Sequence, residues 1–427
     1  MVELSLPYGK TEVFVRIPDE NLIGIINPKE RQGVADPKAE IIRALENPIN
    51  SKKLIDIAKP GNKAAIVIDD VTRPPPSYLM IPPILDELNK AGVKDEDITI
   101  LIGSGTHRKA TPEEAAKLVG EDVYKRIKVV NHDAKSPDIV CVGETKFKTK
   151  VCVNKIFVDA DIKILTGDIE LHYYAGYGGG RKGVIPAIGG VDTIQHNHSM
   201  ILDPKAALGV LEGNPIHEDM TESAKLAKVD FILNVVLNDR KEIVGAFAGD
   251  LEQAFLEGVK LVDEMYKVNV EQPADIVITS ADGDPHDIDL YQALKAVENV
   301  KNIVKEGGVI ILVAECREGY GNQVFYDWMT RLRSIEDVEK EVRKKFVVGG
   351  HKAYYLLRVL GKAKIILVST MPDYYASGVF KLRTAKTVNA ALNTAFNIVG
   401  KKSTIWVVPH GAVTYCNTTL PILLSSK

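Results

Sequence analysis

Four loops of this sequence concentrate the side chains that could move protons or bind anions. They span residues 69–76, 103–114, 167–199 and 281–295. Together they hold Asp70, Thr72, Arg73, His107, His172, Arg181, Lys182, His196, His198, His286, Tyr291, Gln292 and Lys295. Histidine has a reference pKa of ~6.5, which suits proton transfer near neutral pH, and arginine binds carboxylates through two contacts. The residue types therefore indicate a site that holds an anion and moves protons.

The third loop contains a glycine-rich segment, GYGGGRKG, at residues 176–183. Glycines let backbone N–H groups approach an anion closely. The segment fits neither standard phosphate fingerprint, because Gly183 stands where a P-loop has Ser or Thr, and Pro186 follows where a dinucleotide fold continues into a helix. The sequence favours a nucleotide or phosphate site somewhere on this loop, with a plain tight turn as the alternative.

His196 and His198 form an H-x-H pair in the same loop. On an extended chain the two side chains would share one face and could hold a metal. No HExxH or carboxylate pattern accompanies them, so spacing alone leaves a metal role open for either histidine.

Short β-branched runs and helical patterns must position these loops. The expected strands are 64–68, 98–103, 161–167, 274–280, 308–314, 364–369 and 404–408. The expected helices are 111–127, 251–267 and 290–304, the first with Thr111 and Glu114 at its start. This alternation predicts an α/β protein with mainly parallel or mixed sheets flanked by helices. Ligands of such sheets lie beyond the carboxyl ends of the strands, where the four loops are.

The chain is too long for one ordinary core, because single cores stop growing near ~250–300 residues, and the chain has 427. We expect an N-terminal α/β domain at 1–268 and a C-terminal α/β domain at 269–427, with the active site in the cleft between them. The last ~20 residues could pack back on the first domain. The N-terminal domain would carry the histidines and Lys182, and the C-terminal domain would supply Tyr291, Gln292 and Lys295.

Composition excludes several classes of partner and compartment. The net charge of −3 and the pI of about 6.3 do not indicate a nucleic-acid-binding face. No run approaches the ~18 apolar residues of a membrane span, and no apolar signal core opens the chain. Four cysteines (Cys141, Cys152, Cys316 and Cys416) form no CxxC pair. We expect a cytoplasmic protein with reduced thiols.

Five segments in this order resemble the nickel-pincer lactate racemase family over most of the chain. They are DDVTRP, GSGTHR, the interval from His172 to Lys182, the Asn197–His198 pair, and YQALK at 291–295. The resemblance implies a cofactor, a pyridinium mononucleotide whose two sulfur arms grip nickel. It implies that Lys182 carries this cofactor covalently, as a thioamide, and that His198 completes the nickel site.

The resemblance also implies the roles of the remaining loop residues. His107 and His172 would act as alternating acid and base on either side of a 2-hydroxy acid. Asp70, Val71 and Thr72 would contact the cofactor, and Arg73 would lie near cofactor and substrate. The substrate carboxylate would be held by Tyr291, Gln292 and Lys295. The reaction would interconvert D- and L-lactate by removing a hydride to the cofactor, together with the hydroxyl proton, and returning both.

Several alternatives stay open at this point. The substrate could be another 2-hydroxy acid, such as malate, an aryl-lactate or a sugar acid, and His351 is an unassigned candidate for its pocket. Lys182 could bind only a phosphate, and His196 could replace His198 on nickel. Different classes are a nicotinamide-dependent dehydrogenase and a non-catalytic nucleotide-phosphate binder. The family cofactor needs separate maturation enzymes, which are therefore expected partners.

Overall fold

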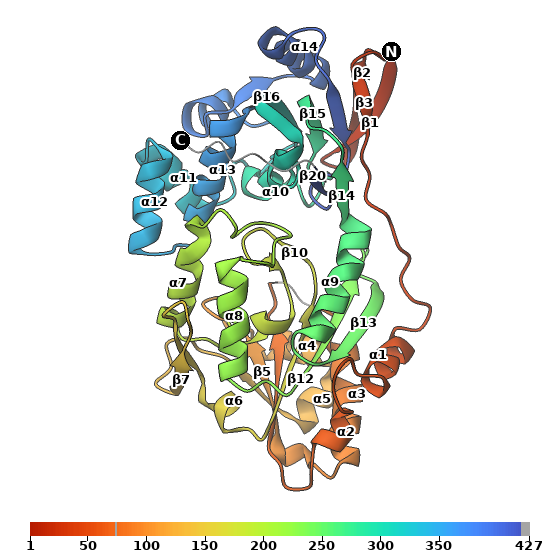
Figure 1. The fold of residues 1–427 in the computed structure, drawn as a ribbon, viewed down its shortest axis with the longest axis vertical. Helices are drawn as coiled ribbons and strands as arrows, with labels where there is room; N and C mark the ends of the chain where they lie inside the picture. Colours follow the sequence, from red (N-terminus) through yellow and green to blue (C-terminus); the bar gives the residue numbers. More distant parts are fainter. Residues whose placement is uncertain (73–74, 420–427) are drawn as a thin grey trace. The chain divides into compact units, whose positions relative to one another are not determined.

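The computed structural model describes residues 1–72 and 75–419, and the chain divides into two compact units (Figure 1). Unit 2 spans Glu30–Glu264. Unit 1 combines Met1–Lys29 with the chain from Met265 onward. Each unit is built on its own six-stranded sheet flanked by helices, which confirms the predicted two-domain α/β class.

The sheet of unit 2 is parallel except for one edge strand. In order across the sheet, its strands are β13 (Ile243–Gly249), β12 (Phe231–Leu237), β9 (Ile162–Asp168), β4 (Ala64–Asp69), β5 (Ile98–Gly103) and β6 (Lys128–Asn131). Only β13 runs antiparallel to its neighbour. The carboxyl ends of β4, β5 and β9 therefore meet at one edge, from which the first three reactive loops leave.

Helices and short hairpins surround this sheet. The α-helices are α1 (Pro37–Glu46), α2 (Leu54–Ile57), α3 (Ser77–Lys90), α4 (Pro112–Val119), α5 (Glu121–Arg126), α6 (Lys155–Asp159), α7 (Val191–Ser199), α8 (Pro215–Leu226) and α9 (Gln253–Tyr266). The two hairpins are β7 (Ile139–Glu144) with β8 (Lys150–Asn154), and β10 (Leu171–His172) with β11 (Gly176–Tyr177). The 3-10 turns are η1 (Asp95–Asp97), η2 (Gly180–Gly183) and η3 (Met200–Leu202). One sheet face packs on α1, α3, α4 and α5 in a continuous apolar core.

The sheet of unit 1 is parallel throughout. Its strands in order are β18 (Arg383–Ala385), β17 (Lys364–Val368), β16 (Val304–Val313), β15 (Ala274–Ser280), β19 (Ile405–Val408) and β3 (Leu22–Ile25). Its α-helices are α10 (Leu290–Val300), α11 (Gln323–Arg331), α12 (Ile335–Lys344), α13 (Gly350–Lys362) and α14 (Val388–Val399), with a 3-10 turn η4 (Lys301–Ile303) and a π-turn η5 (Tyr374–Val379). A second, two-stranded parallel pair joins β14 (Lys267–Val270) to β20 (Tyr415–Thr418).

The N-terminal segment does not belong with the unit that follows it, which corrects the expected assignment of residues 1–29. Strands β1 (Val2–Tyr8) and β2 (Thr11–Ile17) form a hairpin whose Leu6, Val15 and Ile17 enter the core of unit 1. Strand β3 then pairs with β19 at the edge of the sheet of unit 1. The described part of the chain end also lies in unit 1, because β20 pairs with β14.

The predicted elements are found close to their expected bounds. Each of the seven expected strands is present, from β4 to β19, and the expected helices at 251–267 and 290–304 are α9 and α10. The helix expected at 111–127 starts with the predicted capping box of Thr111 and Glu114. It is divided into α4 and α5 by Gly120, whose φ of +90° lies outside the helical region.

The expectation of four reduced thiols is wrong for one pair. Cys141 on β7 and Cys152 on β8 are register partners in the hairpin and are joined by a disulfide. Cys316 and Cys416 are buried and not bonded to another cysteine. The hairpin brings together two residues that the sequence separates by eleven positions.

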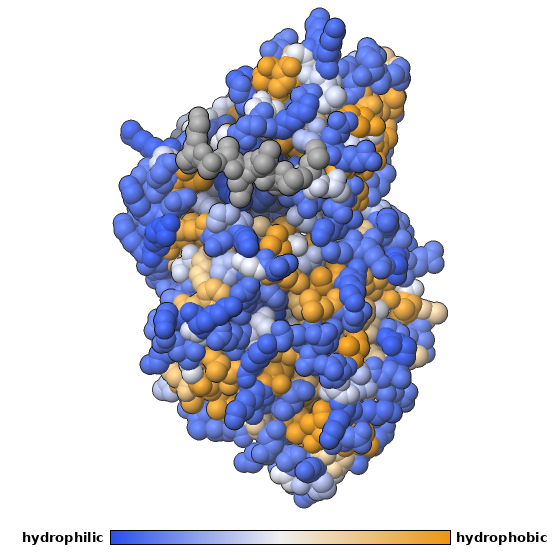
Figure 2. Space-filling model, in the orientation of Figure 1, coloured by the Kyte–Doolittle hydropathy of each residue, from blue (hydrophilic) through white to orange (hydrophobic). Residues whose placement is uncertain are grey.

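The surface in view is mainly hydrophilic, with hydrophobic patches scattered among hydrophilic residues (Figure 2). Across the described ranges, no helix combines the length and apolar character that crossing a bilayer requires.

Candidate functional site

Asp70 and His107 form a hydrogen-bonded pair where β4 and β5 end. The Asp70 Oδ2 atom lies 2.8 Å from Nδ1 of His107. The other carboxylate oxygen, Oδ1, accepts bonds from the Thr72 backbone N–H at 3.0 Å and hydroxyl at 2.6 Å. Burial acts to raise the pKa of Asp70, but the bonds from His107 and Thr72 outweigh it and the pKa is lowered. A charged Asp70 holds the proton of His107 on Nδ1 and leaves Nε2 as the basic nitrogen.

His172 lies in the small β10–β11 hairpin and is buried. Its ring stacks on Tyr173 with centroids 5.0 Å apart and meets Tyr174 edge-on at 4.4 Å. The Ala175 backbone N–H donates to its Nδ1 at 3.3 Å. Tyr174 also contacts the ring of His198, with centroids 5.2 Å apart. One tyrosine therefore connects the proposed base His172 to the proposed metal ligand His198.

Lys182 is carried by the 3-10 turn η2, which follows the glycine run. Gly180 begins the turn, and its backbone N–H donates to Oδ1 of Asn234 on β12 at 2.9 Å. A Cβ atom on Gly183 would lie 3.1–3.2 Å from the side chain of Leu165 on β9. The glycines therefore let the turn lie directly on the sheet, and the turn carries Lys182.

The guanidinium of Arg181 stabilises this turn by hydrogen bonds to backbone carbonyl oxygens. It donates to the carbonyl oxygens of Ala175 at 2.7 Å, Gly179 at 3.1 Å and Gly178 at 3.4 Å. Its carbon lies 4.5 Å from the centre of the Phe255 ring. Burial lowers the pKa of Arg181 to about 9. Arg181 thus fixes the glycine segment that leads into Lys182.

Charged groups crowd around Lys182. Burial and the neighbouring Asp168 carboxylate raise the pKa of Asp69 to about 8, while Lys182 acts on it in the opposite direction. Burial, followed by the charges of Lys182 and His107, lowers the pKa of His198 to about 3. His198 is therefore a neutral imidazole at neutral pH. Lys182 therefore lies within electrostatic range of both Asp69 and His198, and His107 lies within range of His198.

The two histidines of the H-x-H pair lie on helix α7, not on an extended chain. Because two residues advance a helix by more than half a turn, His196 and His198 face different ways. His196 is exposed and its Nε2 lies 3.0 Å from the carbonyl oxygen of Phe147. His198 is buried. The expectation that the two rings share one face is therefore wrong, and a metal site formed by both histidines together is not possible in this arrangement.

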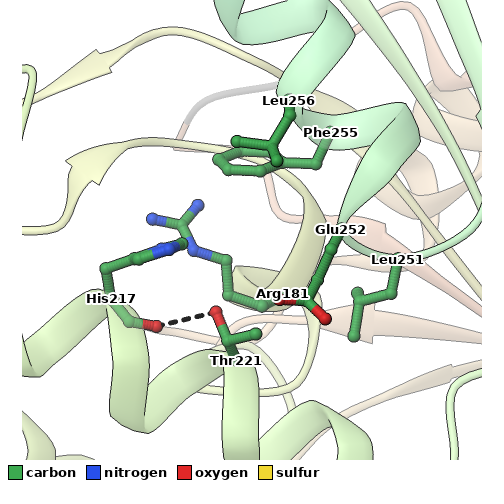
Figure 3. A pocket seen from close by; sticks show the side chains of 7 residues that line it. All are labelled: Arg181, His217, Thr221, Leu251, Glu252, Phe255 and Leu256. Carbon is green, nitrogen blue, oxygen red and sulfur yellow. Dashed lines mark hydrogen bonds between the residues drawn. The ribbon is translucent and has the colours of Figure 1, made fainter. Parts of the chain in front are cut away.

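Two pockets adjoin Arg181 and Val71, the chain neighbours of Lys182 and Asp70. One, drawn in Figure 3, measures about 30 Å³ and is lined by Arg181, His217 and Phe255 among others. That volume suits a water molecule or two but not a hydroxy acid. A larger pocket of about 360 Å³ adjoins Val71 and Tyr78. Neither lining includes His107, His172, Lys182 or His198, so the site is defined by converging side chains.

The His217 ring makes a testable contribution to the pH dependence of stability. Burial, with a smaller effect of Arg181, lowers its pKa to about 3, against ~6.5 in an unfolded chain. Between these values the unfolded state binds a proton that the folded state does not, so stability falls as the pH falls. His217→Leu should reduce this slope by up to ~1.4 kcal/mol per pH unit.

The measurement is the free energy of unfolding by urea at several pH values from 7 to 4, on protein without cofactor. His196→Ala is the control, because His196 is exposed and should leave the slope unchanged. An unchanged slope in His217→Leu would show that the ring gains its proton in the folded state as well.

Tyr291, Gln292 and Lys295 lie in the first turns of α10 in unit 1. Asp289 caps this helix by accepting from the Gln292 backbone N–H at 2.8 Å. All three side chains are partly buried, so they are not a plain exposed helix turn. The Tyr291 ring meets His351 edge-on at 6.2 Å, and the Lys352 Nζ lies 5.2 Å from its centre. His351 therefore lies beside the predicted carboxylate-binding residues.

The remaining predicted residues are placed as follows. Val71 is partly buried and packs against the apolar core of unit 2, so any cofactor contact would involve its backbone or an edge of its side chain. Arg73 lies outside the described residues. Within those residues, no group of three or more His, Cys, Asp or Glu side chains is arranged to hold a metal ion.

Sequence reasoning missed three residues that shape the site. Asn234 is a lone amide inside the apolar strand FILNVVL, and that contrast was a usable signal. Tyr174 adjoins His172 in sequence but gave no sign of reaching His198. Asp69 adjoins Asp70 at a strand end, and only the fold shows that the two carboxylates face different partners.

Comparison with known proteins places the chain in a family. A model of the lactate racemase N-terminal domain matches residues 8–209, and one of the lactate racemase C-terminal domain matches 269–415. The lactate racemase of Thermoanaerobacterium thermosaccharolyticum is 39% identical over 96% of this chain and 98% of its own. That of Lactiplantibacillus plantarum is 34% identical over 96% and 99%.

Solved structures agree with these sequence matches. The lactate racemase apoprotein of T. thermosaccharolyticum aligns with a TM-score of 0.87 at 38% identity, over 97% of this chain and 100% of its own. A crystal structure of a Thermotoga maritima protein, 19% identical, aligns over 89% and 97% with a TM-score of 0.59 and shows the fold alone. From the domain matches, the identities and the fold together, the chain belongs to the lactate racemase family.

Proposed function

We propose that this chain interconverts D- and L-lactate, with His107 and His172 as the proton-carrying residues and Lys182 and His198 as the cofactor anchors. The observation that carries the proposal is the arrangement within unit 2. Three groups of residues lie at one sheet edge. They are His107 with its partner Asp70, His172 in contact through Tyr174 with the buried neutral ring of His198, and Lys182 on the glycine turn.

The residues present fit a nickel-pincer nucleotide. His198 is neutral, as a metal ligand must be, and its pKa of about 3 keeps it so. Lys182 lies on a turn whose glycines allow close approach, within range of His198. Bound there, such a nucleotide would supply a carbon centre that accepts and returns a hydride. Lys182 would hold it covalently, Thr72 and the backbone near Val71 would contact it, and its maturation enzymes would be partners of this protein.

The chain's own residues would manage the proton and the carboxylate. His107, with its Nδ1 proton held by Asp70, would take the hydroxyl proton of one enantiomer at Nε2. His172 would take the hydroxyl proton of the other enantiomer, because racemisation has to run in both directions. Lys295 and Gln292, with Tyr291 beside them, would hold the substrate carboxylate, joined by Arg73. Two fixed contacts on the carboxylate would keep its carbon in place while the face of attack changes.

Lactate carrying deuterium at Cα should test this proposal. Matured protein should convert either enantiomer to the other, and the product should keep its deuterium in ordinary water. A hydrogen removed as a proton by a side chain would instead exchange with solvent. No added dinucleotide should be consumed, which separates this activity from that of a nicotinamide-dependent dehydrogenase. Protein without cofactor is the control.

Two outcomes would change the assignment. Extensive loss of label in the first turnovers would contradict the hydride route while leaving a racemase. Turnover of malate, an aryl-lactate or a sugar acid in preference to lactate would change the assigned substrate. His351, which lies beside Tyr291, is the residue that we would then examine.

A further inference from the structure

A buried chain of hydrogen bonds leads to the ring of His198. The Asn197 side chain lies between two partners: its Oδ1 is 3.2 Å from Nδ1 of His198, and its Nδ2 is 2.7 Å from Oδ2 of Asp219 on α8. Asn197 and Asp219 are completely buried, and His198 is 5% exposed. These hydrogen bonds are therefore shielded from solvent, and water does not compete for their donors and acceptors.

The partners of the Asn197 amide fix which way round it lies. Nδ2 also lies 3.2 Å from the carbonyl oxygen of Ile216, so both of its neighbours on that side are acceptors. An amide nitrogen only donates, and an amide oxygen only accepts. Turning the amide over would place its oxygen against two acceptors. Oδ1 must therefore face His198, and the ring nitrogen that it meets, Nδ1, must be the donor.

Asp219 is itself held in place. The Thr145 hydroxyl donates to its Oδ1 at 2.5 Å, which leaves Oδ2 to receive the Asn197 amide. Contacts from Thr145, α7 and α8 thus converge on one orientation of this imidazole.

We propose that Asn197 and Asp219 are positioning residues that keep the His198 proton on Nδ1 and so present the Nε2 lone pair to the metal. This inference rests on the proposed role of His198 as the nickel ligand. In a neutral imidazole one nitrogen carries the proton and the other is free to bind a metal, and the hydrogen bond to the first decides which. Such partners of metal-binding histidines typically contribute 10–100-fold to metal affinity.

The tautomer can be measured without any cofactor. Protein labelled with ¹⁵N in its histidines and prepared without cofactor should show His198 with a protonated Nδ1 and an unprotonated Nε2. His198→Gln assigns the signals. Asn197→Leu should shift His198 toward the opposite tautomer or a mixture, whereas His196→Ala, on the exposed side of the same helix, should change nothing. The wild-type protein with its proton on Nε2, or an unchanged tautomer in Asn197→Leu, would overturn the inference.

A reciprocal exchange separates polarity from simple loss of packing. Asn197→Asp alone places two carboxylates against each other in a buried site and should destabilise the protein or disturb His198. Combined with Asp219→Asn, the amide at 219 can donate to the carboxylate at 197, which still accepts from Nδ1. Only the hydrogen bond to the Ile216 carbonyl is then lost. The double variant should therefore restore the wild-type tautomer. A double variant that folds, as judged by circular dichroism, but keeps the disturbed tautomer would contradict the proposed hydrogen-bond polarity.

The consequence for the metal is measured on matured protein. Asn197→Leu should lose nickel to EDTA about 10–100-fold faster than the wild-type protein and the double variant, with Lys182 still modified. Equal nickel retention in Asn197→Leu, despite a changed tautomer, would remove the link from tautomer to metal. Undiminished nickel in His198→Ala would instead refute His198 as the nickel ligand. The tautomer measurement would still test the hydrogen bonds of Asn197 and Asp219 independently of the metal.

Discussion

Lys182→Ala should abolish both the covalent adduct and lactate racemisation in protein co-produced with the maturation enzymes. The reason is geometric, because Lys182 is the side chain that the glycine turn presents within range of His198. Its amine is the nucleophile that could form the bond. Intact mass should show the wild-type protein heavier than its sequence by one nucleotide adduct, and digestion should place the added mass on the peptide that holds Lys182. Activity of the variant should fall to that of protein without cofactor.

Lys182→Arg is the matched variant for this prediction. It keeps the positive charge but replaces a nucleophilic amine with a guanidinium that stays protonated, so it should also lack the adduct. If Lys182 served only to bind a phosphate, Lys182→Arg would retain much of the activity. A racemising wild-type protein with an unmodified Lys182 would refute the tether.

Arg181 offers a second control next to the same residue. It contacts the glycine run rather than the proposed cofactor site, through the carbonyls of Ala175, Gly178 and Gly179. A substitution there acts on the stability of the turn, so its effect on adduct formation should follow the loss of folded protein. The effect of Lys182→Ala should not, because its side chain is only partly buried.

Local patterns were enough to predict the framework of the fold. Parallel strands buried on both faces read as continuous β-branched runs, so β4, β5, β9 and β15 were readable from sequence. The assignment of residues 1–29 failed for the opposite reason. The pairing of β3 with β19 joins segments about 380 positions apart, and no local pattern encodes such a contact.

The candidate site also combines features that local sequence predicts with contacts that only the fold determines. Residue types and loop positions pointed to the four loops, because strand-end loops gather chemistry in α/β sheets, and the family resemblance singled out His107, His172 and Lys182 within them. The sequence could not show that Asp70 faces His107, since their contact depends on the neighbouring ends of β4 and β5. The H-x-H pair misled because its two-residue period suggests an extended chain, whereas α7 forms after Gly190 and buries His198 but not His196.

Replacing either proposed base should slow racemisation by roughly 10²–10⁴, the usual contribution of a positioned acid or base. His107→Ala and His172→Ala should each slow conversion in both directions, because a complete conversion uses one histidine to take the proton and the other to return it. The first half of the reaction, which converts lactate to keto acid, distinguishes the two variants. After acid quench, each variant should still release keto acid from one enantiomer, and the two variants should differ in which enantiomer that is. A His172→Ala protein of nearly wild-type activity would refute the two-base scheme.

Asp70→Asn tests whether the contact seen at the end of β4 is what makes His107 a base. The asparagine has the size of aspartate and can still accept from Thr72, but it lacks the charge that holds the proton on Nδ1 of His107. If the amide turns its NH₂ toward Nδ1, the ring proton moves to Nε2, and His107 can no longer take a proton there. Racemisation should then fall by about the factor seen for His107→Ala, ~10²–10⁴. Keto acid should be lost from the enantiomer that His107 serves and retained from the other. An Asp70→Asn protein that loses both half-reactions equally, while keeping its adduct, would show instead that Asp70 acts on the cofactor rather than on His107.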